Sequence, residues 1–264
     1  MKRLLAATAI SVTVGEPVMA QESVGGGAMP RSASSLSLSD IQSVSPALGR
    51  YAEEDVIGNL WQRPQLSRRD RSIVTVAVLI ARSQAVDLKH HLGVALNNGV
   101  TPTEVSEIIT HLAFYSGWSN AMFAIVATKD VFKDRGITAD QMPAASPQLL
   151  PLNEETECQR ATGVEKNVGP ISPGLVQFTT DPLFLDLWQR PGLAPRDRSL
   201  VTVSSLIASG QSTQITYHLN RAMDNGLTAE EAGEVVAHTA FYAGWPNAFS
   251  ASSVVGEVLR SRAM

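Results

Sequence analysis

Apolar residues recur along this chain at the spacing of α-helices. A long apolar run occupies residues 73–81 and returns at residues 200–208, and Val105, Ile108 and Leu112 fall on one face of a helix. No stretch of useful length alternates apolar and polar residues in the way that a half-buried strand does. The pattern therefore predicts an all-α protein.

Helix start and stop signals divide the apolar stretches into four predicted helices in each half of the chain. Ser67 and Thr101 each precede an acidic residue by three positions, as in a capping box, and Pro195 suits the first position of a helix. Gly99 and Gly117 suit helix ends, and both glycines recur in the second half. The predicted helices cover residues 68–81, 87–98, 101–116 and 119–132, and then residues 195–208, 214–225, 228–243 and 246–259.

The two halves are copies of one module. Residues 60–72 read LWQRPQLSRRDRS and residues 187–199 read LWQRPGLAPRDRS, and the alignment continues without a gap through the fourth predicted helix, with about half of the positions identical. We place module 1 at residues 45–135 and module 2 at residues 172–262. A Gly/Ser-rich tract at 21–44 is predicted to be a flexible leader, and the proline-containing segment 136–171 a linker.

The first twenty residues have the pattern of a secretory signal peptide. Lys2 and Arg3 precede a short apolar stretch, and small residues occupy the positions that a signal peptidase reads, with cleavage expected after Ala20. The protein is therefore predicted to be periplasmic or secreted, the alternative being an N-terminus with no targeting role. No apolar run reaches the roughly 20 residues of a membrane-spanning helix.

Composition narrows the classes of function. The chain has 264 residues, a formal net charge of −4, 44% hydrophobic and 17% charged residues, and no basic stripe, which is typical of a globular protein and argues against nucleic-acid binding. Cys158 is the only cysteine, so the chain has no Cys-x-x-Cys pair and no internal disulfide. Neither a metal-ligand spacing nor a glycine-rich phosphate loop occurs, so no metal or cofactor is expected.

His91 and His218 are the first candidates for catalysis, because polar residues that are identical in two copies are informative. His91 follows Leu88 by three positions and precedes Ala95 by four, so it shares the apolar face of its helix. His218 repeats this placement. A hydrogen-bonded core histidine is the alternative for both.

Two carboxylate–imidazole pairs are further candidates. Glu107 and His111 are four residues apart, hence neighbours on one helix face, and Glu234 and His238 repeat the pair. A carboxylate beside an imidazole orients a general acid or base and keeps its pKa near neutrality. A solvated contact on the helix surface explains the spacing equally well.

Cations cluster where the first predicted helix of each module begins. Arg69 and Arg71, with Arg196 and Arg198 in the second copy, lie near backbone N–H groups at a helix N-terminus, which is a favourable place for a substrate carboxylate. In the alternative, Asp70 caps the helix and the arginines pair with acids across a subunit contact.

Trp118 and Trp245 follow the third predicted helix of each module. They are interpreted as packing anchors in the core or at an interface, or as residues that line a substrate pocket.

Three motifs, each present in both copies, give the chain its resemblance to a known family. They are L-x-x-R-D-R-S-φ-V-T-V, H-L-x-x-A-φ-x-N-G-φ-T-x-x-E and F-Y-x-G-W-x-N-A, where φ is apolar. Together they resemble the carboxymuconolactone decarboxylase family. The resemblance implies two alkylhydroperoxidase D-like helical modules that form an intramolecular pseudo-dimer, and further assembly into a homo-oligomer such as a trimer of pseudo-dimers.

The resemblance also implies a cofactor-free acid/base enzyme, a decarboxylase or lactone-processing enzyme acting on a small lactone or unsaturated cyclic carboxylate. Decarboxylation needs an anchor for the carboxylate, a donor for the developing dienolate oxygen and an acid that protonates carbon. His91 is a candidate by similarity, and Arg71 with the Glu107/His111 pair by chemistry.

The thiol peroxidases of the alkylhydroperoxidase D branch carry a Cys-x-x-Cys before the motif histidine. This chain has Gln84 and Asp87 at those positions, and Gln211 and Gln214 in module 2, so peroxidase chemistry is excluded. Two alternatives remain: a non-catalytic binding or scaffold protein, and an enzyme in which only one copy keeps a working site.

Overall fold

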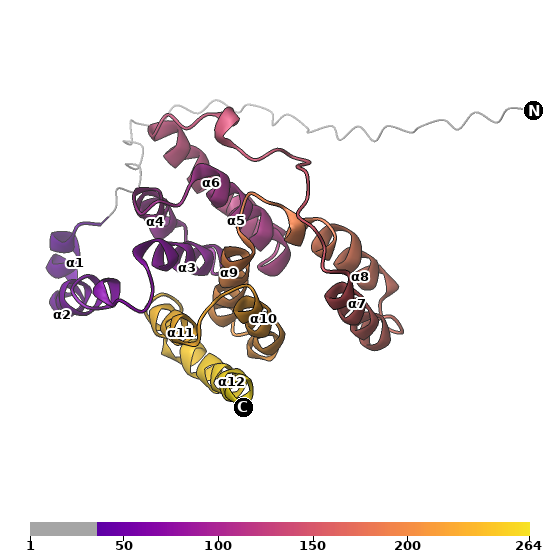
Figure 1. The fold of residues 1–264 in the computed structure, drawn as a ribbon. Helices are drawn as coiled ribbons and strands as arrows, with labels where there is room; N and C mark the ends of the chain where they lie inside the picture. Colours follow the sequence, from indigo (N-terminus) through magenta and orange to yellow (C-terminus); the bar gives the residue numbers. More distant parts are fainter. Residues whose placement is uncertain (1–35) are drawn as a thin grey trace, which may run out of the picture. The chain divides into compact units, whose positions relative to one another are not determined.

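The described part of the protein, residues 36–264 of a computed structural model, is all-α, as the apolar spacing predicted (Figure 1). It contains twelve α-helices and no strand, with short 3-10 and π-helical turns between some of the helices. No helix in residues 36–264 is long and apolar enough to cross a membrane. The predicted signal peptide, and most of the predicted leader, lie outside the described residues and stay predictions.

Each module contains the four predicted helices, with ends that differ from the predicted ones by a few residues. Module 1 has α3 (Arg68–Ala81), α4 (Ala85–Asn97), α5 (Pro102–Tyr115) and α6 (Trp118–Asp134). Module 2 has α9 (Pro195–Ala208), α10 (Ser212–Asp224), α11 (Ala229–Ala243) and α12 (Trp245–Ala263).

Local chemistry at the helix ends follows the sequence closely. Thr101 and Thr228 form complete capping boxes at the starts of α5 and α11. Ser67 caps α3 by accepting a hydrogen bond from the backbone N–H of Asp70, whereas the Asp70 carboxylate faces an arginine of module 2. Gly117 has a φ of 97°, a conformation that side chains other than glycine rarely adopt, and this lets α6 start directly after α5.

The two modules share one hydrophobic core. Helices α3 and α9 pack against each other at its centre, α11 packs on α3, and α5 packs on α9, so each module completes the other (Figure 1). Residues 73–80 of α3 and residues 197–208 of α9 are buried along their whole length. The predicted pseudo-dimer is therefore present within a single chain.

Two segments contain helices that the sequence analysis did not predict. The predicted leader ends in α1 (Leu38–Val44), followed by α2 (Pro46–Tyr51), and the predicted linker contains α7 (Glu154–Val168), followed by α8 (Pro173–Phe178). Helix α7 has Asn153 as its cap and acidic residues in its first turn. Its apolar face is narrow, so periodicity did not reveal it.

Candidate active site

The two motif histidines lie in equivalent aromatic sites that span both modules. His91 on α4 is stacked on Trp61 of its own module and meets Tyr242 of module 2 edge-on, with ring centroids 6.4 and 5.4 Å apart. His218 on α10 meets Trp188 and Tyr115 in the same way, at 6.1 and 5.1 Å. Each site therefore takes its histidine and tryptophan from one module and its tyrosine from the other.

A hydrogen bond closes each aromatic cluster. The indole N–H of Trp61 donates to the Tyr242 hydroxyl, and that of Trp188 to the Tyr115 hydroxyl, both at 2.9 Å. The tyrosine oxygen thus accepts from the indole, which leaves its own proton free to be donated. These tryptophans and tyrosines were absent from the predicted site residues, although their identity in both copies was the sequence feature that could have indicated them.

The carboxylate–imidazole pairs also cross between the modules, and this corrects the predicted grouping. Glu107 and His111 belong to the His218 site, where Glu107 accepts hydrogen bonds from Arg198 and Arg190. His111 Nε2 lies 2.7 Å from the Thr202 hydroxyl. The sequence analysis grouped Arg71, His91, Glu107 and His111 together, because residue order gives no information about which module supplies a facing helix.

The His91 site repeats this arrangement with the modules exchanged. Arg71 and Arg63 donate to Glu234, each at 2.9 Å or less, and Thr75 lies 2.8 Å from His238 Nε2. Burial alone would raise the pKa of the Glu234 carboxyl, but the hydrogen bonds from Arg63 and Arg71 hold it below its ordinary value. The predicted neighbours Glu234 and His238 therefore face Arg71.

Arg71 and Arg198 are completely buried and held by internal partners. One Nη of each donates to the carboxylate across the module boundary and to a backbone carbonyl eight residues earlier in the chain. Arg71 and Arg198, which were predicted to bind the substrate, thus make hydrogen bonds within the protein core. A buried, charge-assisted hydrogen bond of this kind fixes the positions of the two helices that it joins.

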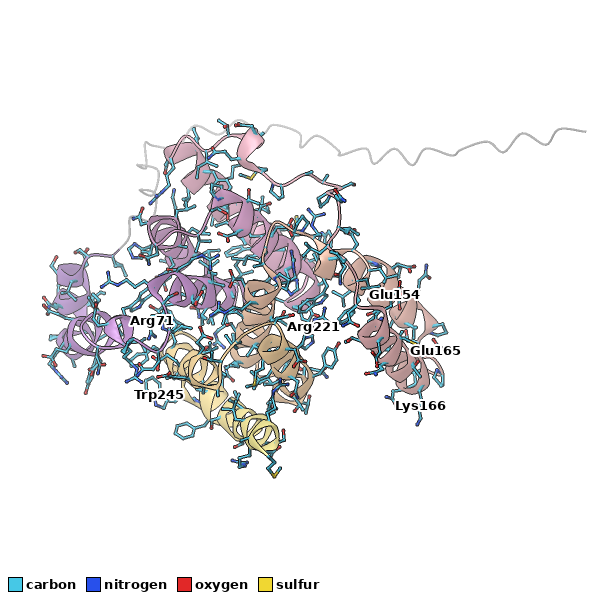
Figure 2. All side chains as sticks on the ribbon, in the orientation of Figure 1. Arg71, Glu154, Glu165, Lys166, Arg221 and Trp245 are labelled. Carbon is cyan, nitrogen blue, oxygen red and sulfur yellow. The ribbon has the colours of Figure 1, made fainter. Side chains whose placement is uncertain are left out.

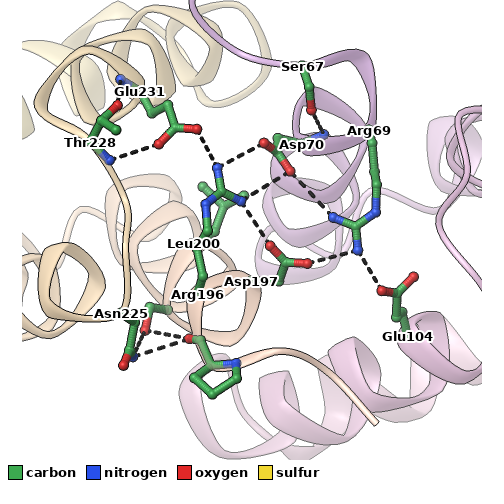
Figure 3. Close-up of polar contacts among 12 residues, drawn as sticks. Ser67, Arg69, Asp70, Glu104, Arg196, Asp197, Leu200, Asn225, Thr228 and Glu231 are labelled. Carbon is green, nitrogen blue, oxygen red and sulfur yellow. Dashed lines mark hydrogen bonds and ion pairs between the residues drawn. The ribbon is translucent and has the colours of Figure 1, made fainter.

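Two ion pairs join the starts of α3 and α9, each between an arginine of one module and an aspartate of the other (Figure 3). Arg69 pairs with Asp197 at 2.8 Å, and Arg196 pairs with Asp70 at 3.0 Å. Each arginine also pairs with the capping glutamate of its own module. The alternative interpretation had Asp70 as the helix cap and the arginines paired with acids across a subunit contact. The pairing with acids is present, but it joins the two modules of one chain, and the cap of α3 is Ser67. The structure does not bring Arg69 and Arg196 into the aromatic sites.

Trp118 and Trp245 lie outside the aromatic sites. They are 64% and 51% exposed at the starts of α6 and α12, and each contacts a phenylalanine of the preceding helix.

Burial keeps the site histidines neutral. Loss of water around them lowers the pKa of both His91 and His218 to about 4, with smaller contributions from His90 and Arg221 respectively. The Nδ1 atoms of both are buried and have no hydrogen-bond partner among the described residues. Burial also raises the pKa of the Tyr115 hydroxyl, so that it keeps its proton.

These pKa shifts predict a loss of stability on acidification. An unfolded histidine binds a proton near pH 6.5, whereas His91, His218 and His238 remain neutral in the folded protein until the pH approaches 4 or 3. Between pH 7 and pH 5 the unfolded state binds more protons, so the free energy of unfolding should fall by about 2 kcal/mol for each buried histidine. Urea unfolding at several pH values measures this.

The exposed His90 provides the control for this measurement. His90→Gln should change the slope of stability against pH by much less than one buried histidine does, because His90 is exposed and contributes only the smaller part of the lowered pKa of His91. A free energy of unfolding that is flat from pH 7 to pH 5 in the unmodified protein would show that these three histidines are not held neutral.

A cavity of about 800 Å³ opens beside the His218 site. His218 and Tyr115 form part of its wall, and α7 together with the turn 179–184 covers it. His91 lines neither this cavity nor any of three smaller ones elsewhere in the described residues. Among those residues, no group of three or more His, Cys, Asp and Glu side chains is arranged to hold a metal ion.

Comparison with known proteins identifies the two modules. The sequence profile of the carboxymuconolactone decarboxylase family matches residues 48–130 and 173–257. The chain belongs to this family. It is 41% identical over 85 residues to 4-carboxymuconolactone decarboxylase of Acinetobacter baylyi, an alignment that covers 32% of this chain and 63% of the relative.

The second relative acts on a different compound. The chain is 36% identical over 77 residues to nitrosuccinic acid decarboxylase npaB of Metarhizium robertsii, covering 29% of this chain and 54% of the relative. The chain thus spans less than two thirds of the length of either relative. Both are named as decarboxylases.

Proposed function

We propose that the protein is a cofactor-independent carboxy-lyase of its family, acting on a small lactone or an unsaturated cyclic carboxylate. The observation that carries the proposal is a neutral histidine, His218, with an unpartnered Nδ1 and its ring packed edge-on against that of Tyr115, both at the wall of a cavity. The names of the two relatives, both decarboxylases, support this class of reaction.

The reaction replaces carbon dioxide with a proton. The bond between the ring carbon and the carboxylate breaks, carbon dioxide leaves, and the electron pair moves into the conjugated carbonyl to give an enolate. The Tyr115 hydroxyl, itself accepting from Trp188, can donate a hydrogen bond to the oxygen on which negative charge develops.

His218 can supply the proton that carbon requires. A bound carboxylate favours the protonated imidazole, so His218 takes up a proton from water when the substrate binds and transfers it to carbon after carbon dioxide has left. The imidazole ends neutral, and water supplies the one proton that the reaction consumes.

A binding or scaffold protein is the second candidate function. It is favoured by the internal pairing of the two predicted substrate anchors, Arg71 with Glu234 and Arg198 with Glu107. A screen of lactones and unsaturated cyclic carboxylates distinguishes the two functions, with carbon dioxide release and ring opening measured separately. The enzyme is expected to release carbon dioxide from at least one compound, and a protein that binds compounds of the screen without converting any of them would be a binding protein.

We also propose that the chain self-associates through an apolar face that occurs once in each module. In module 1, Trp118, Met122 and Val126 are at least half exposed along α6, and in module 2 Trp245 and Phe249 are exposed on α12. Two equivalent faces on one chain allow each chain to contact two others and so to close a ring.

Sedimentation equilibrium tests the assembly. Met122→Lys with Phe249→Lys should reduce the mass from that of an oligomer to that of one chain, because lysine cannot be buried at such an interface without a partner. An unmodified protein that already sediments as one chain would contradict the proposal.

A further inference from the structure

The two copies of the site differ in what surrounds them. Helix α7 lies over the His218 site and brings Arg160 to the cavity wall, and α10 carries Arg221 one turn after His218. At the position of Arg221, module 1 has Val94 on α4. Phe184 is 4% exposed beside the His218 site, whereas its counterpart Ile57 is 56% exposed.

Arg160 is buried, and one of its side-chain nitrogens has no hydrogen-bond partner among the described residues. Its Nε and one Nη bind both oxygens of Glu157, and its guanidinium lies 4.2 Å from the centroid of the Phe184 ring. The residue is 8% exposed, and the other nitrogen, Nη1, is buried without a partner among the described residues. An unpaired buried N–H group is costly, which points to a ligand that accepts from it.

Arg221, on α10, contacts the same stacked aromatic pair. Its guanidinium is 4.3 Å from the Trp188 ring centroid and 5.4 Å from that of Phe184 (Figure 2). Its Nε is buried without a partner, and it forms no ion pair within residues 36–264. Arg221 lines a small cavity that shares Thr156 with the large one.

The charges that line these two adjoining cavities do not balance. Arg160 and Arg221 are cationic, and Glu157 is the one acidic residue in the two walls. Apolar and aromatic side chains, including Val164, Leu183 and Phe184, form much of the rest of the wall of the large cavity. Such a site suits an apolar ring that carries a negative charge.

We propose that Arg160 and Arg221 form the carboxylate-binding subsite of the His218 site, and that the small cyclic carboxylate binds at this site and not at the His91 site. The inference rests on the proposed function and adds which of the two copies binds the substrate and which cations anchor it. Helix α7, outside both modules, then determines specificity by covering the His218 site.

Isothermal titration with furan-2-carboxylate and its uncharged analogue furan-2-carboxamide tests the subsite without any turnover. The unmodified protein should bind one equivalent of the carboxylate per chain. Arg221→Val, which restores the module 1 residue, should weaken carboxylate binding by about tenfold or more, because a charge-assisted hydrogen bond is lost, and should leave carboxamide binding unchanged.

Two further variants complete the design. Glu157→Gln with Arg160→Gln removes the second anchor without leaving a buried charge unpaired, and should also weaken carboxylate binding by about tenfold. Arg262→Gln removes an equal charge from an exposed pair with Asp224 and should have no effect on binding.

Several outcomes would overturn the subsite. They are no carboxylate binding by the unmodified protein up to the solubility limit, unchanged affinity in both anchor variants, or an equal loss of carboxamide binding. Failure of the proposed function gives a different result. In that case carboxylate binding depends on Arg221, but no compound of the screen releases carbon dioxide.

Discussion

Replacing His218 by alanine is expected to lower kcat/KM for decarboxylation by a factor of about 10² to 10⁴, the range for loss of a general acid or base. His218 lies at the wall of the large cavity, with a buried and unpartnered Nδ1 and its ring packed edge-on against that of Tyr115. No other histidine lines that cavity. Removal of this imidazole therefore leaves the reacting carbon without a proton donor.

His91→Ala is the matched control, because it removes the equivalent histidine from the equivalent aromatic cluster. Arg221 has no cationic counterpart beside His91, so this variant should keep most of the activity. The double variant should have no measurable turnover and an unchanged helical circular dichroism spectrum. Full activity in the double variant would contradict the assignment of both histidines, and equal losses in the two single variants would contradict the difference between the sites.

Replacing Glu107 by glutamine is expected to lower the free energy of unfolding by about 3 to 5 kcal/mol, as when one partner of a buried ion pair is removed. Glu107 is completely buried and accepts from two buried arginines, Arg190 and Arg198. Glutamine keeps the shape but not the charge, so both guanidinium groups lose their counter-ion. The loss is measured by urea unfolding at pH 7.

Glu234→Gln is the internal comparison for this prediction. Glu234 faces Arg71, which is buried, and Arg63, whose side chain is 43% exposed and can regain water. The stability loss should therefore be smaller than for Glu107→Gln. Equal or reversed losses would show that the exposure of the second arginine does not determine the cost.

The helices and their ends could be predicted because their causes are local. Apolar spacing, the Thr101 and Thr228 capping boxes and Gly117 each act within a few residues, and the structure has helices where these residues predict them. Helix α7 was missed because it has one buried residue, the cationic Arg160, and most of its side chains face water, among them Glu154, Glu165 and Lys166 (Figure 2). Its position depends on contacts with residues distant in the sequence, such as that of Arg160 with Phe184, which a local pattern cannot predict.

The composition of each site could not be predicted from one copy of the module. Identity between the copies indicated His91, His218 and the carboxylate–imidazole pairs, but a duplicated sequence does not say whether a helix faces its own module or the other. Arg160 and Arg221 were missed because neither has a cationic counterpart in module 1. The sequence analysis looked for polar residues that are identical in both copies, so it did not select them. Residues that are identical in both modules indicated what the two sites have in common, and residues that differ indicate how the surroundings of the two histidines differ.

The central claim is that each site is shared between the modules, and a double-mutant cycle on stability tests it without a substrate. Glu107→Gln is combined with Arg198→Met, its partner across the module boundary, and separately with Arg71→Met, the equivalent arginine of its own module. Glu107 and Arg198 should show a coupling free energy of about 2 kcal/mol, whereas Glu107 and Arg71 should be additive to within about 0.5 kcal/mol. Coupling of Glu107 to Arg71 with none to Arg198 would contradict the shared sites and assign each site to a single module.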